Sequence, residues 1–262
     1  KNATKQKEIV LSYFQLAVSD KKPIPVKRLI ETSNSTSAVV KALIDKTIFE
    51  GVEHFKKAEA EGRGILLVGG HFTTLDLMGT LAAQHINVDM IYRPQKNPVI
   101  NYLMIRRRES HQGRMISHHD TRGLLHALKN SHGVWYPLDQ DYGRQQAIFV
   151  PFFGVTAATL TTASRLTKFH GARLIFIGVQ RLGDAQRYRV IFTPALENFP
   201  SDDVVADTTR INLELEKLIR LAPTQYMWFH RRFKTQADGL PEPYAMKKKW
   251  KKRLQSLKSS QP

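Results

Sequence analysis

Apolar and polar positions follow two patterns that alternate along most of the chain. Short apolar runs, such as Ile-Leu-Leu-Val at 65–68, are typical of strands that a parallel sheet buries on both faces. Between them, apolar residues recur every three or four positions, as on one face of a helix. Strands are predicted at 65–68, 88–92, 114–117, 134–138, 172–179 and 188–193, and helices at 35–61, 73–84, 97–108, 121–129, 159–170 and 202–220. This alternation predicts an α/β fold with a mostly parallel or mixed central sheet and helices on both faces.

The two ends carry patterns of their own. Residues 1–19 read as a short amphipathic helix, and residues 149–154 read as an apolar turn before the helix at 159–170. No Ser/Gly-rich linker divides the chain, so 1–244 is predicted to be a single domain. Residues 245–262 hold six lysines and one arginine without an acid, and apolar residues recur among them at helical spacing. Such a tail suits an anionic bilayer surface, with a solvated tail as the alternative.

Composition narrows the possible partners. The chain has 262 residues, a net charge of +17 and no cysteine. The charge predicts an anionic partner, which is a nucleic acid, a phosphorylated lipid, a membrane surface or an acidic protein. The missing cysteine excludes disulfides, thiolate metal sites and a cysteine nucleophile. No run is apolar and long enough to span a membrane.

Candidate chemistry follows the first predicted strand. Gly69 and Gly70 permit a sharp turn, and His71 and Asp76 come next, five positions apart. If His71 lies on the loop and Asp76 lies one turn inside the following helix, Asp76 accepts one imidazole N–H and leaves the other nitrogen as a general base. The helix N-terminus adds backbone donors for a developing oxyanion. The alternative is an ordinary strand–turn–helix corner with two polar residues.

Three other features allow different functions. Asp139 and Asp141 follow the strand at 134–138 and predict, as one alternative, a metal-dependent glycosyltransferase. His111, His118 and His119 have no recognised ligand spacing, so no metal site is predicted there. The aromatic run Tyr226-Met-Trp228-Phe229 beside basic residues is compatible with nucleic-acid binding. Since no binding motif accompanies it, these aromatics are interpreted as core residues.

Five blocks of the sequence, taken together, resemble the lipid A late (secondary) acyltransferases of Gram-negative bacteria, most closely the lauroyl- and myristoyl-transferring type. They fall in the family's order and cover roughly residues 60 to 235. The blocks are His71-Phe-Thr-Thr-Leu-Asp76; Tyr92-Arg-Pro94 with Asn97-Pro98; Asp139-Gln-Asp-Tyr-Gly143; Val150-Pro-Phe-Phe-Gly154 with Ala158-Thr159; and Pro223-Thr-Gln-Tyr-Met-Trp-Phe-His-Arg-Arg-Phe-Lys234.

The resemblance implies an enzyme that moves a fatty acyl chain from acyl carrier protein to a hydroxyl of a hydroxyacyl chain on a Kdo-bearing lipid A precursor. It implies a fold like that of glycerol-3-phosphate acyltransferases and a place on the cytoplasmic face of the inner membrane, with an N-terminal anchor that precedes this sequence. Acyl carrier protein is a substrate, and no cofactor, metal or covalent enzyme intermediate is expected.

The resemblance also assigns residues. His71 and Asp76 fill the family's catalytic motif, and its functional arginine and aspartate fall on Arg108 and Asp139. Asp139 is expected to hold Arg108 by a charged hydrogen bond, while Arg108 or backbone N–H groups stabilise the oxyanion. Other arginines are predicted to meet the acidic carrier protein or the anionic lipid: Arg93, Arg106, Arg107, Arg231 and Arg232.

Overall fold

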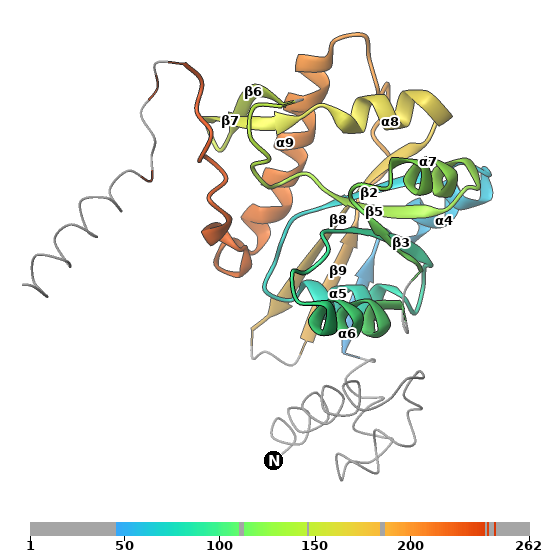
Figure 1. Ribbon diagram of the computed structural model, residues 1–262. Helices are drawn as coiled ribbons and strands as arrows, with labels where there is room; N and C mark the ends of the chain where they lie inside the picture. Colours follow the sequence, from blue (N-terminus) through green and yellow to red (C-terminus); the bar gives the residue numbers. More distant parts are fainter. Residues whose placement is uncertain are drawn as a thin grey trace, which may run out of the picture.

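The computed structural model describes residues 46–109, 113–145, 147–183, 187–238, 240 and 244 (Figure 1). The helix predicted at 1–19, the first part of the helix predicted at 35–61, the basic tail at 245–262 and His111 lie outside the described residues. The domain boundary proposed at 244 therefore stays a prediction.

The described strands build one large mixed sheet and a separate hairpin. The large sheet has the order β1-β9-β8-β2-β5-β3-β4, and within it only the β8–β9 pair is antiparallel. Its strands are β1 (Thr47–Glu50), β2 (Ile65–Gly69), β3 (Val88–Tyr92), β4 (Met115–Ser117), β5 (Gly133–Pro137), β8 (Arg173–Leu182) and β9 (Arg187–Phe192). The expected mostly parallel or mixed sheet is confirmed.

Helices cover both faces of this sheet. They are α4 (Val52–Ala60), α5 (Leu75–Ala82), α6 (Pro98–Glu109), α7 (Thr121–Lys129), α8 (Thr162–His170) and α9 (Val204–Leu221), followed by 3₁₀ turns at Pro223–Gln225 and Trp228–His230. Side chains alternate between the faces of a strand, so close contacts identify which helix covers which face.

The contacts of β5 and β8 divide the helices into two layers. A side chain at Gly133 would meet Phe55 of α4, and Trp135, two positions along the same strand, lines a cavity with α5. On the other face, a side chain at Gly178 would meet Leu218 of α9. Helices α4 and α5 therefore lie on one face and α9 lies on the other, which confirms the predicted two-sided covering.

The helix predicted at 35–61 is confirmed at Val52–Ala60 but is wrong for the described residues before it. Thr47–Glu50 forms β1, parallel to β9, and α4 begins only at Val52. The two elements are separated by Gly51, which has φ +74 and whose Cβ position would lie 2.0 Å from the Phe192 carbonyl oxygen. A continuous right-handed helix cannot contain that conformation. The helical spacing of apolar residues continues across Gly51, so it does not reveal the break between β1 and α4.

The apolar turn predicted at 149–154 is instead part of a hairpin. Strands β6 (Ala147–Phe152) and β7 (Val155–Leu160) pair antiparallel across Phe153 and Gly154, which have φ +50 and +75. Positive φ at both central residues suits the twist of a two-residue hairpin. Helix α8 consequently begins at Thr162. Of the residues that were predicted to open it, Thr159 and Leu160 finish the hairpin and Thr161 is the N-cap.

Candidate active site

Register brings His71 and Asp139 together at the carboxyl edge of the sheet. Strands β2 and β5 are parallel neighbours with Gly69 opposite Pro137, and each functional residue follows two positions later. His71 Nδ1 lies 2.7 Å from Asp139 Oδ1, and the His71 backbone N–H donates to Oδ2 at 2.7 Å. The Asp139 side chain is completely buried, whereas 15% of the His71 side chain is exposed. The carboxyl edge of a parallel sheet is where α/β proteins collect their ligands.

The electrostatics of Asp139 fix the tautomer of His71. Burial alone would raise the pKa of Asp139, but the hydrogen bonds from the imidazole and backbone N–H of His71, together with the imidazole's charge, lower the pKa overall. An ionised Asp139 accepts hydrogen bonds and cannot donate one, so the proton of a neutral His71 sits on Nδ1. The lone pair is then on Nε2, the nitrogen that can act as a base.

The segment after α9 fixes the loop that carries His71. Phe72 and Tyr226 form an antiparallel bridge, the Met227 N–H donates to the His71 carbonyl oxygen at 2.9 Å, and the Thr73 N–H donates to the Gln225 carbonyl oxygen at 2.9 Å. Tyr226 is buried and its hydroxyl lies 3.4 Å from the Asp139 carbonyl oxygen. His71 is therefore held by Asp139 on one side and by residues 225–227 on the other.

Gly69 and Gly70 serve this site by leaving room. Neither has a positive φ, so the sharp-turn explanation is wrong. A Cβ at Gly69 would lie 2.9 Å from Trp135 Nε1, and one at Gly70 would lie 3.3 Å from the Tyr226 ring. Small residues at both positions let Trp135, Tyr226 and Asp139 close around His71.

The two predicted carboxylate pairings are exchanged in the structure. Asp76, expected to orient His71, instead accepts from Arg108 Nε at 3.1 Å and from Arg108 Nη2 at 3.0 Å. Asp139, expected to hold Arg108, holds His71 instead. The physical reason is placement. Helix α5 begins at Leu75 and the Asp76 side chain is 59% exposed, while Asp139 follows two residues after β5, the strand next to the one that precedes His71.

A second imidazole and an amide also reach the site. Gln140 Nε2 lies 3.2 Å from His71 Nε2 and 3.1 Å from His230 Nδ1, and the two imidazole ring centroids are 4.8 Å apart. Burial lowers the pKa of His230, and the charge of His71 lowers it further. Sequence reasoning quoted both residues within the resembling blocks but gave neither a role. The sequence signal that could have pointed to Gln140 was its position directly after Asp139.

Comparison with known proteins shows the family to which the chain belongs. A family profile described as "Bacterial lipid A biosynthesis acyltransferase" matches residues 27–235. The chain belongs to this family. It is 39% identical over 195 residues to the "Lipid A biosynthesis lauroyltransferase" of Escherichia coli K12, covering 74% of this chain and 64% of that protein. It is 37% identical over 191 residues to the palmitoleoyltransferase of the same strain, covering 72% of this chain and 62% of that protein.

Two more distant similarities were also found. The lipid A biosynthesis myristoyltransferase of Escherichia coli K12 is 25% identical over 201 residues, which cover 76% of this chain and 62% of that protein. A solved structure, the 1-acyl-sn-glycerophosphate acyltransferase of Thermotoga maritima, has a TM-score of 0.44 and 11% sequence identity, covering 84% of this chain and 98% of that one. The matched region is less than two thirds of the length of these curated lipid A relatives.

The arginines predicted to bind substrate occupy different settings in this family member. Arg93 and Arg106 are exposed, and Arg107 and Arg231 are half-buried. Arg232 is only 2% exposed and donates to the Ala158 carbonyl oxygen and to Thr159 Oγ1, each at 2.6 Å. This placement corrects the expectation for Arg232, whose guanidinium holds β7 of the hairpin instead of facing a substrate.

The aromatic residues that were interpreted as core residues also differ in burial. Tyr226 is 4% exposed, as expected, while Trp228 is 45% and Phe229 73% exposed, so the core interpretation is wrong for these two.

Among the described residues, the carboxylates and histidines that could hold a metal lie in three separate places. Asp141 accepts from the backbone N–H groups of Gly143 and Thr235, so its carboxylate and that of Asp139 bind different partners and do not converge on one ion. In the part of the chain that the structure describes, His71, Asp139 and His230 place ligand atoms within 4.8 Å of one another. The two rings of His118 and His119 lie 3.8 Å apart at a separate cavity.

Proposed function

We propose that this chain transfers a fatty acyl group from the thioester of acyl carrier protein to a hydroxyl of a hydroxyacyl chain on a Kdo-bearing lipid A precursor. The observation that carries the proposal is the buried carboxylate of Asp139 on Nδ1 of His71, at the sheet edge of a chain that belongs to this family. The similar Escherichia coli proteins are named for transferring lauroyl, palmitoleoyl and myristoyl groups, which supports the reaction type.

His71 supplies the base that such a reaction needs. A hydroxyl is a poor nucleophile until a base takes its proton. Nε2 of His71 accepts that proton while the hydroxyl oxygen bonds to the thioester carbon, and Asp139 stabilises the imidazolium. The oxyanion then collapses, the C–S bond breaks, and the departing thiolate receives the proton from Nε2. No acyl group becomes attached to the enzyme, and Arg108, held by Asp76, adds positive charge that stabilises the oxyanion.

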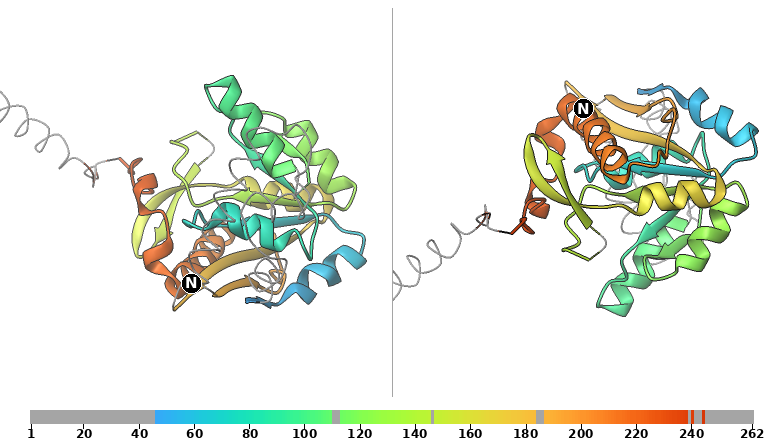
Figure 2. Two further views of the ribbon diagram at one scale, coloured as in Figure 1. Left: turned by 90° about the horizontal axis from the view of Figure 1, so that it is seen from below. Right: turned by 90° about the horizontal axis from the view of Figure 1, so that it is seen from above.

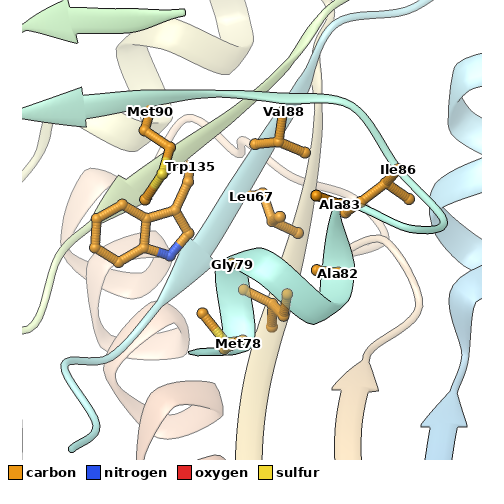
Figure 3. A pocket seen from close by; sticks show the side chains of 10 residues that line it. Leu67, Met78, Gly79, Ala82, Ala83, Ile86, Val88, Met90 and Trp135 are labelled. Carbon is orange, nitrogen blue, oxygen red and sulfur yellow. The ribbon is translucent and has the colours of Figure 1, made fainter. Parts of the chain in front are cut away.

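An apolar seam beside the base is where we propose that the acyl chain enters. Ten residues from α5, the following loop and the sheet line a cavity of about 30 Å³ (Figure 3). Trp135 lines this cavity, and its ring contacts the His71 ring at a centroid distance of 5.7 Å. The α5 side of the cavity is made largely of the small residues Gly79, Ala82 and Ala83. We propose that α5 moves away from the sheet to admit the acyl chain, whose end lies toward Ile86.

Filling this seam is expected to change chain-length preference. Ala82→Leu adds apolar atoms at a position that is 5% exposed and lines the cavity, so longer chains lose room. The ratio of kcat/KM for long over short acyl-carrier substrates should fall by about tenfold or more, since one methylene is worth that much in a fitted pocket. Ala60→Leu, on the exposed face of α4, is the matched control. An unchanged ratio in Ala82→Leu would place the chain elsewhere.

A second cavity and the positive net charge of the chain suit the polar parts of the substrates. A cavity of about 570 Å³ lies at the carboxyl ends of β3, β4 and β5 and is lined by apolar and polar side chains, the polar ones including His118, His119, Thr162 and the carboxylate of Asp120. We assign to it the sugar and acid groups of the acceptor. The net charge of +17 is complementary to those groups and to an acidic carrier protein.

Helix α6 supports a membrane surface as a further partner. It has no buried residue, and Val99, Ile100 and Tyr102 are 63%, 55% and 50% exposed. Figure 2 shows α6 standing out from the body, and its last turn carries Arg106, Arg107 and Arg108. Apolar residues next to arginines suit an anionic bilayer, so we place the reaction at the cytoplasmic face of the inner membrane. Across the described residues, no helix is long and apolar enough to cross a membrane.

Acyl transfer in solution tests the proposed function. The full chain is incubated with acyl carrier proteins of graded chain length and the lipid A precursor, and the products are weighed by mass spectrometry. The wild type should add one acyl mass, and His71→Ala should reduce the yield by about 10²-fold or more because its base is lost. His126→Ala, an exposed histidine on α7, should act like the wild type. An undiminished yield in His71→Ala would remove His71 from the reaction.

Chelation with EDTA distinguishes this reaction from a metal-dependent reaction at His71, Asp139 and His230. The proton transfer proposed here uses Nε2 of His71 directly, so EDTA should leave the yield unchanged. A yield that disappears with EDTA and returns with a divalent metal would instead support a metal held by His71, Asp139 and His230.

A further inference from the structure

The side-chain amide of Gln140 lies between the imidazoles of His71 and His230. The mechanism proposed above gives a role only to His71. Gln140 Nε2 is 3.2 Å from His71 Nε2, 3.5 Å from His71 Nδ1 and 3.1 Å from His230 Nδ1. Since it is almost equally far from both ring nitrogens of His71, it lies over the face of that ring. The lone pair of His71 Nε2 lies in the plane of the ring, so the amide leaves it open to the acceptor hydroxyl. One amide hydrogen can go to His230 Nδ1, and the other is left beside the base.

We propose that Gln140 is a catalytic residue that donates one amide hydrogen to the oxyanion of the thioester, and that His230 is a positioning residue that holds its other hydrogen. This inference rests on the function proposed above. It adds a direct hydrogen-bond donor to the charge that Arg108 provides.

The position over the ring makes the donor available. The acceptor hydroxyl binds His71 Nε2 in the plane of the ring, and the amide above that plane keeps its second hydrogen. The amide nitrogen is 3.2 Å from Nε2, so this hydrogen is within about one hydrogen-bond length of the reacting atoms, where the carbonyl oxygen becomes negative. The bond to His230 Nδ1 persists and keeps the amide in place. The oxyanion loses this partner when the C–S bond breaks and His71 returns its proton to the thiolate.

His230 is suited to hold the amide. Its ring packs edge-on against His71, with an interplanar angle of 82°, and it lies in the 3₁₀ turn Trp228–His230 just after the segment that fixes the His71 loop. Its pKa is lowered by burial and by the charge of His71. A neutral ring with its proton on Nε2 has a lone pair on Nδ1 that can accept from Gln140.

Steady-state kinetics on the full chain test the inference. Gln140→Met keeps the length of the side chain without its donors, so kcat should fall by about 10²–10³-fold, the loss that follows removal of one oxyanion donor. KM for both substrates should change little, because the bond forms only in the transition state. Gln95→Met, at an exposed glutamine after β3, is the matched control.

Variants of His230 separate positioning from folding. His230→Phe keeps the ring without an acceptor and should lower kcat, while His230→Asn keeps an acceptor near Nδ1 and should recover most of the loss. Gln140→Met combined with His230→Phe should be no slower than Gln140→Met alone, because both changes remove one interaction. All variants should unfold at the wild-type temperature.

The outcomes distinguish this inference from the function on which it rests. Normal kcat in Gln140→Met beside an inactive His71→Ala overturns the role of Gln140 and leaves the acyl transfer intact. Multiplying losses in the double variant overturn the role of His230. Full activity in His71→Ala overturns both the proposed function and this inference.

Discussion

Asp139→Asn is expected to lower kcat by about 10³–10⁴-fold, as for other enzymes whose catalytic histidine loses its buried carboxylate. The wild-type carboxylate accepts from His71 Nδ1–H on one oxygen and from the His71 backbone N–H on the other, both at 2.7 Å. An asparagine has only one acceptor atom for these two donors. If its oxygen takes the backbone N–H, its NH₂ faces Nδ1 and moves the imidazole proton to Nε2, which destroys the base.

Folding and the nearby aspartate provide the controls for this prediction. The circular dichroism spectrum and the unfolding temperature show whether Asp139→Asn still folds. Asp76→Asn should lose far less activity, since Asp76 contacts Arg108 and not the imidazole. A larger loss in Asp76→Asn than in Asp139→Asn would return Asp76 to the role that the sequence suggested.

Arg108→Gln is expected to lower kcat by about 10²-fold, because it removes a cation that stabilises the oxyanion. Asp76→Asn should cost less, since the arginine remains but is held less firmly. The double variant should be no slower than Arg108→Gln alone, because Asp76 acts through Arg108. The same acyl-transfer assay measures all three variants against the wild type.

Stability should hardly change in these three variants. The Asp76 side chain is 59% exposed, and ion pairs this exposed contribute roughly 0–1 kcal/mol. Losses of kcat that multiply in the double variant would show that Asp76 and Arg108 act separately, and would contradict the pairing seen here.

Elements that a short stretch of sequence indicates could be predicted. The apolar run at 65–68 identified β2, and His71, three positions after that run, was singled out as the candidate base. Asn97-Pro98 correctly placed the start of α6, where the Asn97 side chain accepts from the Val99 N–H at 2.9 Å. The hairpin of β6 and β7 was missed because Phe153 adopts a positive φ that its residue type does not suggest.

The partner of His71 required information that is not local. Strand β5 lies between β2 and β3 in the sheet although it follows β3 in the chain, and apolar periodicity does not reveal this order. Asp139 is 68 positions from His71, whereas Asp76 is five, so closeness in sequence favoured the wrong carboxylate. His230 is farther still, and it reaches the site only because residues 225–227 pair with the His71 loop.

Nuclear magnetic resonance of the His71 ring nitrogens tests the central claim most directly. In ¹⁵N-histidine-labelled protein near neutral pH, Nδ1 should carry the proton and Nε2 should not. The Nδ1 proton should give a strongly downfield, hydrogen-bonded resonance, as a hydrogen bond to a buried carboxylate requires. This resonance should disappear in Asp139→Asn and His71→Ala and persist in Asp76→Asn. A proton on Nε2 in the wild type, or a resonance lost in Asp76→Asn and kept in Asp139→Asn, would contradict the account.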